Sequence, residues 1–357
     1  MLPSKPRQLN WAGFSFGMIH PMQPRHHLSP SISCVIPAFN EARNLSSLIN
    51  QIVATLTTLS QQIELIVVDD GSRDDTAAVM QAVCQAHPQV VYLKLSRNFG
   101  KEPALTAGIE AARGDVVVLM DGDGQHPVSL VPDMLARWRE GVDVVYAIRR
   151  TRHDQSNLQI TLTGWFYKLV NLGNRVKIPA NAGDFRLMDR QVVDALKRLT
   201  ERNRFMKGLY AWVGFNSTAI DYEPLPRLDG KSNFGLRGSL SLAFTGILAF
   251  SIAPLRALTI TGFLLSVIAL GYGLWVVGEF FFLGINVPGY ATIVVGMMFF
   301  SGIQLLSIGI LSEYVGRIYE EVKQRPNYLV SQRIGDGLPA SATQTSLASS
   351  AVNQPPL

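Results

Sequence analysis

The chain has 357 residues and a formal net charge of +5, and its length leaves room for one large core or two modest ones. Its basic residues form no long Lys/Arg blocks and no nucleic-acid-binding motif is present. We therefore expect an anionic membrane surface or a phosphorylated ligand as the partner, and not nucleic acid. The cysteines, Cys34 and Cys84, form no CxxC pair and lie near no histidine cluster, which argues against a disulfide framework and a zinc site.

Both ends of the chain are predicted to be loosely ordered. Residues 1–30 include an apolar run at 11–18, but histidine, proline and arginine follow at once with no small-residue cleavage site, so this is not a secretory signal. From about Ile334 the chain is rich in Ser, Ala, Thr, Gln and Pro, a composition typical of disorder.

Between these ends, short apolar runs alternate with segments of helical spacing. The predicted strands are residues 31–36 (ended by Pro37), 64–68, 90–95 and 115–120. The predicted helices are residues 45–59, 75–86 and 104–112. This alternation predicts an α/β domain with a mostly parallel, Rossmann-like sheet covered on both faces, in which ligands bind outside the carboxyl ends of the strands.

Two long uncharged stretches, residues 257–278 and 280–312, follow the α/β region. Each exceeds the roughly 20 apolar residues of a transmembrane helix, so we predict a two-helix transmembrane hairpin; a pair of buried helices in a soluble protein is the alternative. Basic residues lie on the outer sides of the pair and only Glu279 lies between. The positive-inside bias therefore places the α/β domain and both termini on the cytoplasmic side of the plasma (inner) membrane. The basic flanking residues are Lys231, Arg237, Arg256, Arg317, Lys323 and Arg325.

The predicted organisation is an extension (1–30), an α/β domain (31–235), an amphipathic helix lying on the membrane (236–256), two transmembrane helices (257–316) and a tail (317–357). For residues 236–256, a helix packed on the α/β domain is the alternative. The segment 205–212, which contains Trp212, either dips towards the interface or forms a buried core helix.

Acidic residues follow the predicted strands. Asp121 and Asp123 come just after the fourth strand and can face one hard cation, Mg²⁺ or Mn²⁺, whose other positions a diphosphate would fill. Gln125 offers a third oxygen ligand, and His126 is expected to be structural. The alternative for such a pair is two solvated turn acids.

The loops after the first two strands carry further candidates. Asp70, in the sequence Asp-Asp-Gly-Ser, either accepts from a base N–H or only caps the helix that follows. Glu41 either holds a ribose or base, or is a first-turn helix acid.

The segments CVIPAFNE, VVDDGSRDDT, RNFGKEPALTAG and VVLMDGDGQHP, in this order, resemble the family-2 glycosyltransferases of the GT-A fold. Within that family the chain resembles the polyprenyl-phosphate glycosyltransferases, namely dolichyl-phosphate mannose synthases, bactoprenol glucosyltransferases and undecaprenyl-phosphate aminoarabinose transferases. The resemblance runs from about Ile32 to Val330. The linked set of motifs is specific, although no single motif is.

The resemblance implies roles for matching positions. The nucleotide pocket would be lined by Pro37, Ala38, Glu41, Asp70 and Asp121. The metal and the donor diphosphate would be bound by Asp121, Asp123 and Gln125. The catalytic residues would be Asp123 and Asp184, the latter in the sequence GDFRLMDR. The acceptor phosphate would meet Arg149, Arg152, Arg227, Lys231 and Ser232.

The chain departs from the family pattern at two places. Asn233 stands where some relatives have lysine, so Lys231 is the candidate cation there. Gly122 and Gly124 replace the commoner Ala and Leu, and both remain compatible with a tight turn.

The implied reaction is inverting transfer of a hexose, glucose being expected, from a nucleotide sugar to a polyprenyl phosphate such as undecaprenyl phosphate. The product is a lipid-linked sugar for envelope glycan modification, and UDP is expected over GDP as the carrier. A phosphate monoester is already mostly dianionic at neutral pH, so arginines that offset its repulsion from the donor matter more than deprotonation. Asp184 would orient the acceptor or take a proton. Further expected partners are the bilayer, a second copy of the chain through small residues on the spans, and a lipid-linked sugar flippase.

Two other functions are the alternatives. A processive polysaccharide synthase of the same family would carry a Gln-x-x-Arg-Trp motif, but here the Gln is absent before Arg137 and Trp138. A non-catalytic membrane scaffold that retains nucleotide binding is the second alternative, and the intact acidic motifs argue against it.

Overall fold

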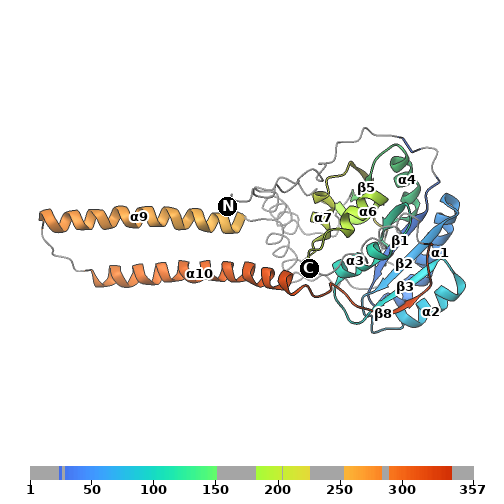
Figure 1. The fold of residues 1–357 in the computed structure, drawn as a ribbon, viewed down its shortest axis with the longest axis horizontal. Coiled ribbons are helices and arrows are strands. Elements are labelled where there is room, and N and C mark those ends of the chain that lie inside the picture. Colours follow the sequence, from blue (N-terminus) through green and yellow to red (C-terminus); the bar gives the residue numbers. More distant parts are fainter. Residues whose placement is uncertain are drawn as a thin grey trace, which may run out of the picture.

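The computed structural model describes residues 24–25, 29–150, 182–202, 204–225, 253–283 and 289–339. Figure 1 shows an α/β domain from which two long helices extend side by side, α9 (Ala253–Leu283) and α10 (Tyr290–Lys323). The predicted interfacial helix at 236–256 lies outside the described residues up to 252, and its last residues begin α9.

The domain is built on an eight-stranded sheet with the order β7-β5-β6-β4-β1-β2-β3-β8. The strands are β1 (Ile32–Ala38), β2 (Ile63–Asp69), β3 (Val90–Leu95), β4 (Val116–Leu119), β5 (Val144–Arg149), β6 (Ala182–Asp189), β7 (Ser217–Tyr222) and β8 (Val330–Ile334). The central strands β4, β1, β2 and β3 are parallel, as predicted, whereas β6 and β8 run antiparallel on either side of them. The predicted α/β class with a mostly parallel sheet is confirmed.

Helices cover both faces of this sheet, and each face has its own hydrophobic core. One face packs α1 (Ala42–Leu59), α2 (Thr76–Ala86), the short 3-10 helix η1 (Val128–Leu130) and α4 (Val131–Arg139). The other packs α3 (Lys101–Ala111), α6 (Arg190–Lys197) and α7 (Met206–Trp212). Because successive residues of β1 point to opposite cores, Cys34 to the first and Val35 to the second, the strand is apolar from Cys34 to Ala38.

The helix α7 decides between the two interpretations of segment 205–212. Met206, Leu209 and Tyr210 are buried in the second core, so this is a core helix. Trp212, at its end, is exposed.

The prediction that Pro37 ends the first strand is wrong, because β1 continues through Pro37 to Ala38. The carbonyl of Val35 accepts from Met120 on the β4 side, and that of Ala38 accepts from Asp70 on the β2 side. By alternation Pro37 faces β4, whose ladder has already ended at the pair of Val35 with Leu119. The missing N–H of the proline therefore costs no ladder hydrogen bond.

The C-terminal segment is more ordered than its composition suggests. The strand β8 pairs with β3, and the backbone N–H of Leu338 donates to Glu64 Oε2 at 2.8 Å. Arg113 Nη1 donates to the carbonyl of Leu338 at 2.6 Å. The prediction of disorder from about Ile334 is thus wrong as far as residue 339, because the segment covers the edge of β3 and satisfies a buried carboxylate. Residues 340–357 lie outside the described residues.

Removing residues 335–357 is expected to destabilise the domain by about 2 kcal/mol, since the buried Glu64 would lose one of its charge-assisted hydrogen bonds. For a domain of this size the expected fall in Tm is roughly 5 °C, measured by thermal unfolding in detergent. The matched control lacks only residues 341–357 and should melt like the full chain. Equal Tm values for both truncations would contradict this role of the Leu338 segment.

The long helices present apolar side chains to their surroundings. On α9, Phe263, Leu264 and Trp275 are exposed, and on α10 so are Met298 and Phe299. This is evidence against the alternative of two buried helices. Within the described residues, one stretch, Gly296–Lys323 of α10, has the length and composition of a membrane span. The chain is therefore a candidate membrane-associated protein, and the two-span hairpin stays a prediction.

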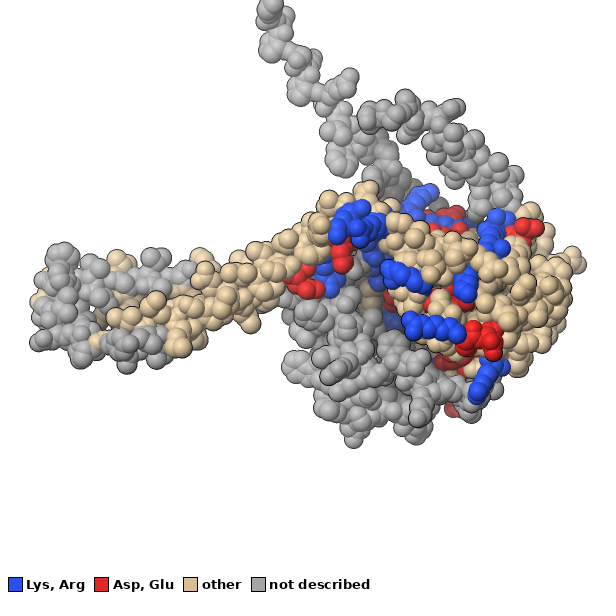
Figure 2. All heavy atoms as spheres, turned by 90° about the horizontal axis from the view of Figure 1, so that it is seen from below, with Lys and Arg blue, Asp and Glu red and all other residues tan. Residues whose placement is uncertain are grey.

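The charged residues of α10 lie at the end of the helix that adjoins the domain. They begin at Glu313, and Figure 2 shows charged side chains gathered where the long helices meet the domain. Glu321 Oε1 accepts from the N–H of Arg202 at 2.7 Å, and Asn327 Nδ2 donates to the carbonyl of Glu201 at 3.3 Å. These bonds tie the end of α10 to the α/β domain.

Candidate active site

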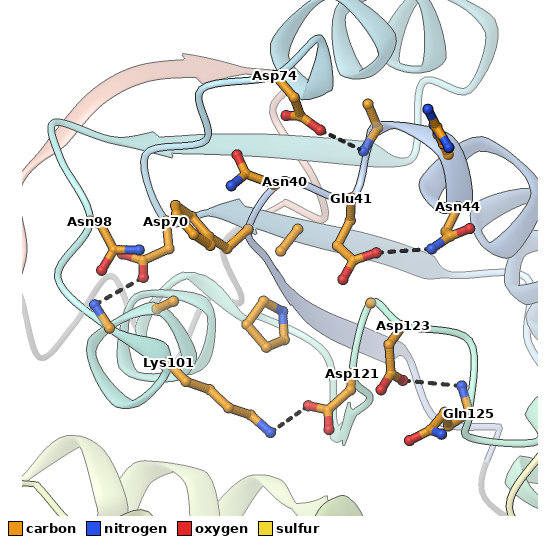
Figure 3. Close-up of a pocket in the computed structure, with 18 of the residues that line it drawn as sticks. Asn40, Glu41, Asn44, Asp70, Asp74, Asn98, Lys101, Asp121, Asp123 and Gln125 are labelled. Carbon is orange, nitrogen blue, oxygen red and sulfur yellow. Dashed lines mark hydrogen bonds and ion pairs between the residues drawn. The ribbon is translucent and has the colours of Figure 1, made fainter. Parts of the chain in front are cut away.

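A cavity of about 790 Å³ opens at the carboxyl ends of β1, β2 and β4, where the sequence predicts a ligand (Figure 3). It brings together the predicted residues Pro37, Ala38, Glu41, Asp70, Asp121, Asp123, Gln125 and Arg149. Residues on its wall that the sequence analysis did not single out include Asn40, Asn44, Asp74, Asn98 and Lys101. Asp184 lies behind this wall and is joined to it through Lys101.

One wall of the cavity is made of two loops that hold each other. Asn40, in the left-handed region at φ 58°, accepts from the N–H of Arg73 at 2.9 Å and donates its own N–H to Ser72 Oγ at 2.9 Å. Asparagine tolerates this backbone conformation better than most residues. Glu41 Oε2 accepts from Asn44 Nδ2 at 2.9 Å. Glu41 is therefore oriented on the cavity wall by its own helix, and its role towards a ribose or base stays a prediction.

Asp70 ties the loop after β3 to the end of β2. Its two carboxylate oxygens accept from the N–H groups of Phe99 at 2.7 Å and Gly100 at 2.9 Å. Burial raises the pKa of Asp70, and these hydrogen bonds only partly offset it. A carboxylate offers about four acceptor positions, so a contact with a base remains open to Asp70 and stays a prediction. The loop-anchoring role was not foreseen.

Position 71, next to Asp70, requires glycine because of its backbone conformation and because backbone atoms of another loop lie too close for a Cβ. Gly71 has φ +70°, and a Cβ there would lie 2.5 Å from the carbonyl carbon of Arg97 and 2.7 Å from the backbone N of Asn98. Backbone atoms cannot move aside as a flexible side chain can. The close approach holds the loop of Asn98 against the cavity.

The substitution Gly71→Ala is therefore expected to push this loop away and to raise the donor KM by about tenfold or more, at a stability cost of about 1–3 kcal/mol. Steady-state kinetics over a donor series, together with Tm, would measure it. The control is Gly214→Ala, because Gly214 has the same φ of +70° but its Cβ would come no closer than 3.8 Å to a neighbour. An equal effect on KM from both variants would contradict the steric argument.

The turn after β4 presents both acids of the DGDG sequence. The N–H of Gln125 donates to Asp123 Oδ1 at 3.1 Å, and the N–H of Asp121 donates to His126 Nδ1 at 3.0 Å. His126 is buried, its ring stacks on Phe185 with centroids 4.7 Å apart, and burial lowers its pKa, in keeping with a neutral acceptor. The expected structural role of His126 is confirmed.

Lys101 joins the two carboxylates that the sequence assigned to different tasks. Its Nζ lies 2.7 Å from Asp121 Oδ1 and 2.7 Å from Asp184 Oδ2, and Figure 3 shows the side chain reaching across to Asp121. Burial alone would lower the pKa of Lys101, but the carboxylates of Asp184 and Asp121 outweigh it and raise that pKa. Lys101 occurs in the quoted segment RNFGKEP, yet no local pattern marked it.

Asp184 is almost fully enclosed, with 11% of its side chain exposed. Burial alone would raise its pKa, but Lys101 and Lys207 outweigh it and hold the pKa below its ordinary value. Next to it, burial and then Asp184 itself raise the pKa of Glu102 to about 7. Asp184 is thus ionised and held by cations.

Arg149 stands at the rim of the cavity. Its Nη2 donates to Gln125 Oε1 at 3.1 Å and its Nε to the hydroxyl of Tyr222 at 3.2 Å. These contacts place a guanidinium beside the acidic turn, and they engage the amide oxygen that was predicted to bind metal. The other predicted phosphate ligands, Arg152, Arg227, Lys231 and Ser232, lie outside the described residues.

The residues of the cavity wall fit a divalent cation that is coordinated partly by the protein and partly by a bound substrate. Within the described ranges, no three His, Cys, Asp or Glu side chains come together as an all-protein metal cage. Mg²⁺ is commonly held by one or two carboxylates, substrate phosphates and water, and Mn²⁺ takes the same oxygen ligands. Asp121 and Asp123 provide such a carboxylate pair on the cavity wall.

This fold and this site are those of a glycosyltransferase of the GT-A type. Residues 33–197 match the family model described as Glycosyl transferase family 2. An uncharacterized glycosyltransferase of Synechocystis sp. is 43% identical over 304 residues, covering 85% of this chain and 96% of the relative. A prophage-derived bactoprenol glucosyl transferase of Shigella flexneri is 40% identical over 301 residues, covering 84% of this chain and 97% of the relative. The chain belongs to glycosyl transferase family 2.

Among solved structures, mannosyl-3-phosphoglycerate synthase from Rubrobacter xylanophilus is similar with a TM-score of 0.43 at 20% identity, over 67% of this chain and 77% of that one.

Proposed function

We propose that this enzyme transfers glucose from UDP-glucose, with inversion, to a polyprenyl phosphate such as undecaprenyl phosphate, and so makes a lipid-linked sugar for envelope glycan modification. The observation that carries the proposal is the match to a bactoprenol glucosyl transferase at 40% identity over nearly that relative's whole length. The cavity with its acid pair supports the same chemistry.

The donor would occupy the cavity at the ends of β1, β2 and β4. The wall formed by Glu41 and Asp70 would receive the nucleoside, and the acidic turn at Asp121 and Asp123 would lie beside the diphosphate. These two carboxylates, with Gln125, would hold Mg²⁺ or Mn²⁺, which supplies neutralisation of the charge that develops on the leaving diphosphate. The reaction needs the acceptor oxygen to reach the anomeric carbon from the face opposite the leaving group.

The acceptor would be presented at the cytoplasmic surface of the plasma membrane. A polyprenyl phosphate keeps its chain in the bilayer, and the apolar helices α9 and α10 would hold the domain there as a two-span hairpin with both termini cytoplasmic. Arg149 at the cavity rim would offset the repulsion between acceptor phosphate and donor, together with Arg152, Arg227, Lys231 and Ser232. A second copy of the chain and a flippase remain predicted partners.

The proposal is tested with purified enzyme in detergent, undecaprenyl phosphate and a panel of radiolabelled nucleotide sugars that includes UDP-glucose and GDP-mannose, with Mg²⁺ or Mn²⁺ added after EDTA treatment. The expected product is an acid-labile labelled lipid formed from UDP-glucose. Label in polymer would support the polysaccharide synthase, and no incorporation would support the scaffold.

A further inference from the structure

The ammonium group of Lys101 connects two strand ends of the site. Asp121 follows β4 on the cavity wall, whereas Asp184 belongs to β6, and both carboxylates lie 2.7 Å from Lys101 Nζ. An ammonium group has three N–H donors, so two carboxylates do not exhaust it. Lys101 itself lines the cavity, which leaves its third N–H able to reach a bound ligand.

The position of Lys101 is set by the backbone around it. Lys101 is the first residue of α3, and Gly100 before it has φ 105°. The N–H groups of Phe99 and Gly100 are both held by Asp70. The start of the helix, and with it the base of the lysine side chain, is thus fixed to the end of β2.

Asp121, which pairs with Lys101, is also the proposed ligand of the divalent cation. A metal bound to Asp121 would lie close to the ammonium of Lys101, and two positive charges at such a distance repel each other. Metal and lysine therefore compete for Asp121. Asp184, which is almost fully enclosed, still needs a cation when Asp121 binds the metal.

We propose that Lys101 is the counter-ion of Asp121 until metal and donor bind. Its released N–H then turns to a donor phosphate oxygen, while its ammonium group keeps Asp184 in place. The inference rests on the proposed metal site at Asp121 and deepens it. Lys101 is then a positioning residue for Asp184, and it lowers the affinity of the free enzyme for metal alone.

The test measures the affinity of the full chain in detergent for Mn²⁺ alone, by electron paramagnetic resonance and without any donor. The transfer rate of each variant is measured separately and compared with its Mn²⁺ affinity. K101M is expected to bind Mn²⁺ about tenfold more tightly than the wild type, a change of about 1.4 kcal/mol. The same variant is expected to transfer glucose at least about a hundredfold more slowly. K101R keeps the charge and should stay near the wild-type Mn²⁺ affinity. A residue that only supports the fold would not strengthen metal binding while it weakens turnover.

The matched control is K207M. Lys207 also lowers the pKa of Asp184 through its charge, but in the described part of the chain it forms no ion pair with Asp121. It should leave Mn²⁺ affinity unchanged. If K101M melts well below the wild type, K101Q, which keeps a hydrogen-bond donor for Asp184, carries the same expectation.

An unchanged or weaker Mn²⁺ affinity of the Lys101 variants, including the case in which neither they nor the wild type bind the ion, overturns the inference. Absence of transfer by the wild type, with tighter Mn²⁺ binding by K101M, would overturn the proposed reaction and leave the role of Lys101 standing.

Discussion

The Asp123→Asn variant is expected to lose transfer by at least about a hundredfold, while its Tm stays that of the wild type. The amide retains an oxygen that can accept from the N–H of Gln125, now 3.1 Å from Asp123 Oδ1, so the turn should persist. The substitution removes the negative charge of residue 123 from the cavity wall. Metal binding should weaken, because hard divalent cations strongly prefer carboxylate oxygen. Asp123 is a cleaner choice than Asp121, because the latter also pairs with Lys101.

This variant is measured by initial rates at saturating UDP-glucose over a series of Mn²⁺ and Mg²⁺ concentrations, with thermal unfolding alongside. The control is Asp133→Asn, which removes an exposed carboxylate from the first turn of α4. Full activity of the Asp123 variant, or of the wild type in EDTA-treated membranes, would rule out the metal role.

The central strands, and the acidic residues that follow them, were predictable because the local sequence of each segment carries its signal. Strands buried on both faces carry continuous apolar runs, as from Leu65 to Val68 in β2, and the acids after them fall at one edge of a parallel sheet. The outer strands carry no such signal. In β8 four of five residues are exposed, and in β7 exposed and partly buried residues alternate, so these strands exist through pairing with distant segments.

The residues that the sequence analysis missed act through tertiary contacts. Lys101 resembles any first-turn lysine until β4 and β6 bring Asp121 and Asp184 to its ammonium from 20 and 83 positions away. Pro37 reads as a strand end because the sequence does not show that β4 stops short of it. The pairing of Asp70 with the N–H groups of Phe99 and Gly100 likewise depends on the neighbouring strand.

The Asp184→Asn variant is expected to lower kcat by about a hundredfold or more and to leave the donor KM within about twofold. Asp184 does not line the cavity wall, so donor binding should survive. The amide is isosteric but cannot serve as the anionic partner of Lys101, which now bridges it to Asp121. The acceptor would then lose its fixed position, whereas Lys101 would still be held by Asp121.

The structure favours an orienting role for Asp184 over that of a base. Lys101 and Lys207 hold the pKa of Asp184 below its ordinary value, which makes it a poor proton acceptor. A phosphate monoester, with a second pKa of about 6, needs little deprotonation at neutral pH. The ratio of wild-type to variant kcat is therefore expected to stay constant from about this pKa upwards.

A pH series of kcat for both proteins, with Asp194→Asn as the control for an exposed carboxylate on α6, decides between the two roles. A base would be replaced by hydroxide as the pH rises, so the variant would regain activity and the ratio would fall. A constant ratio would leave orientation of the acceptor as the role of Asp184, and would explain why this carboxylate is held by cations that make it a weaker base.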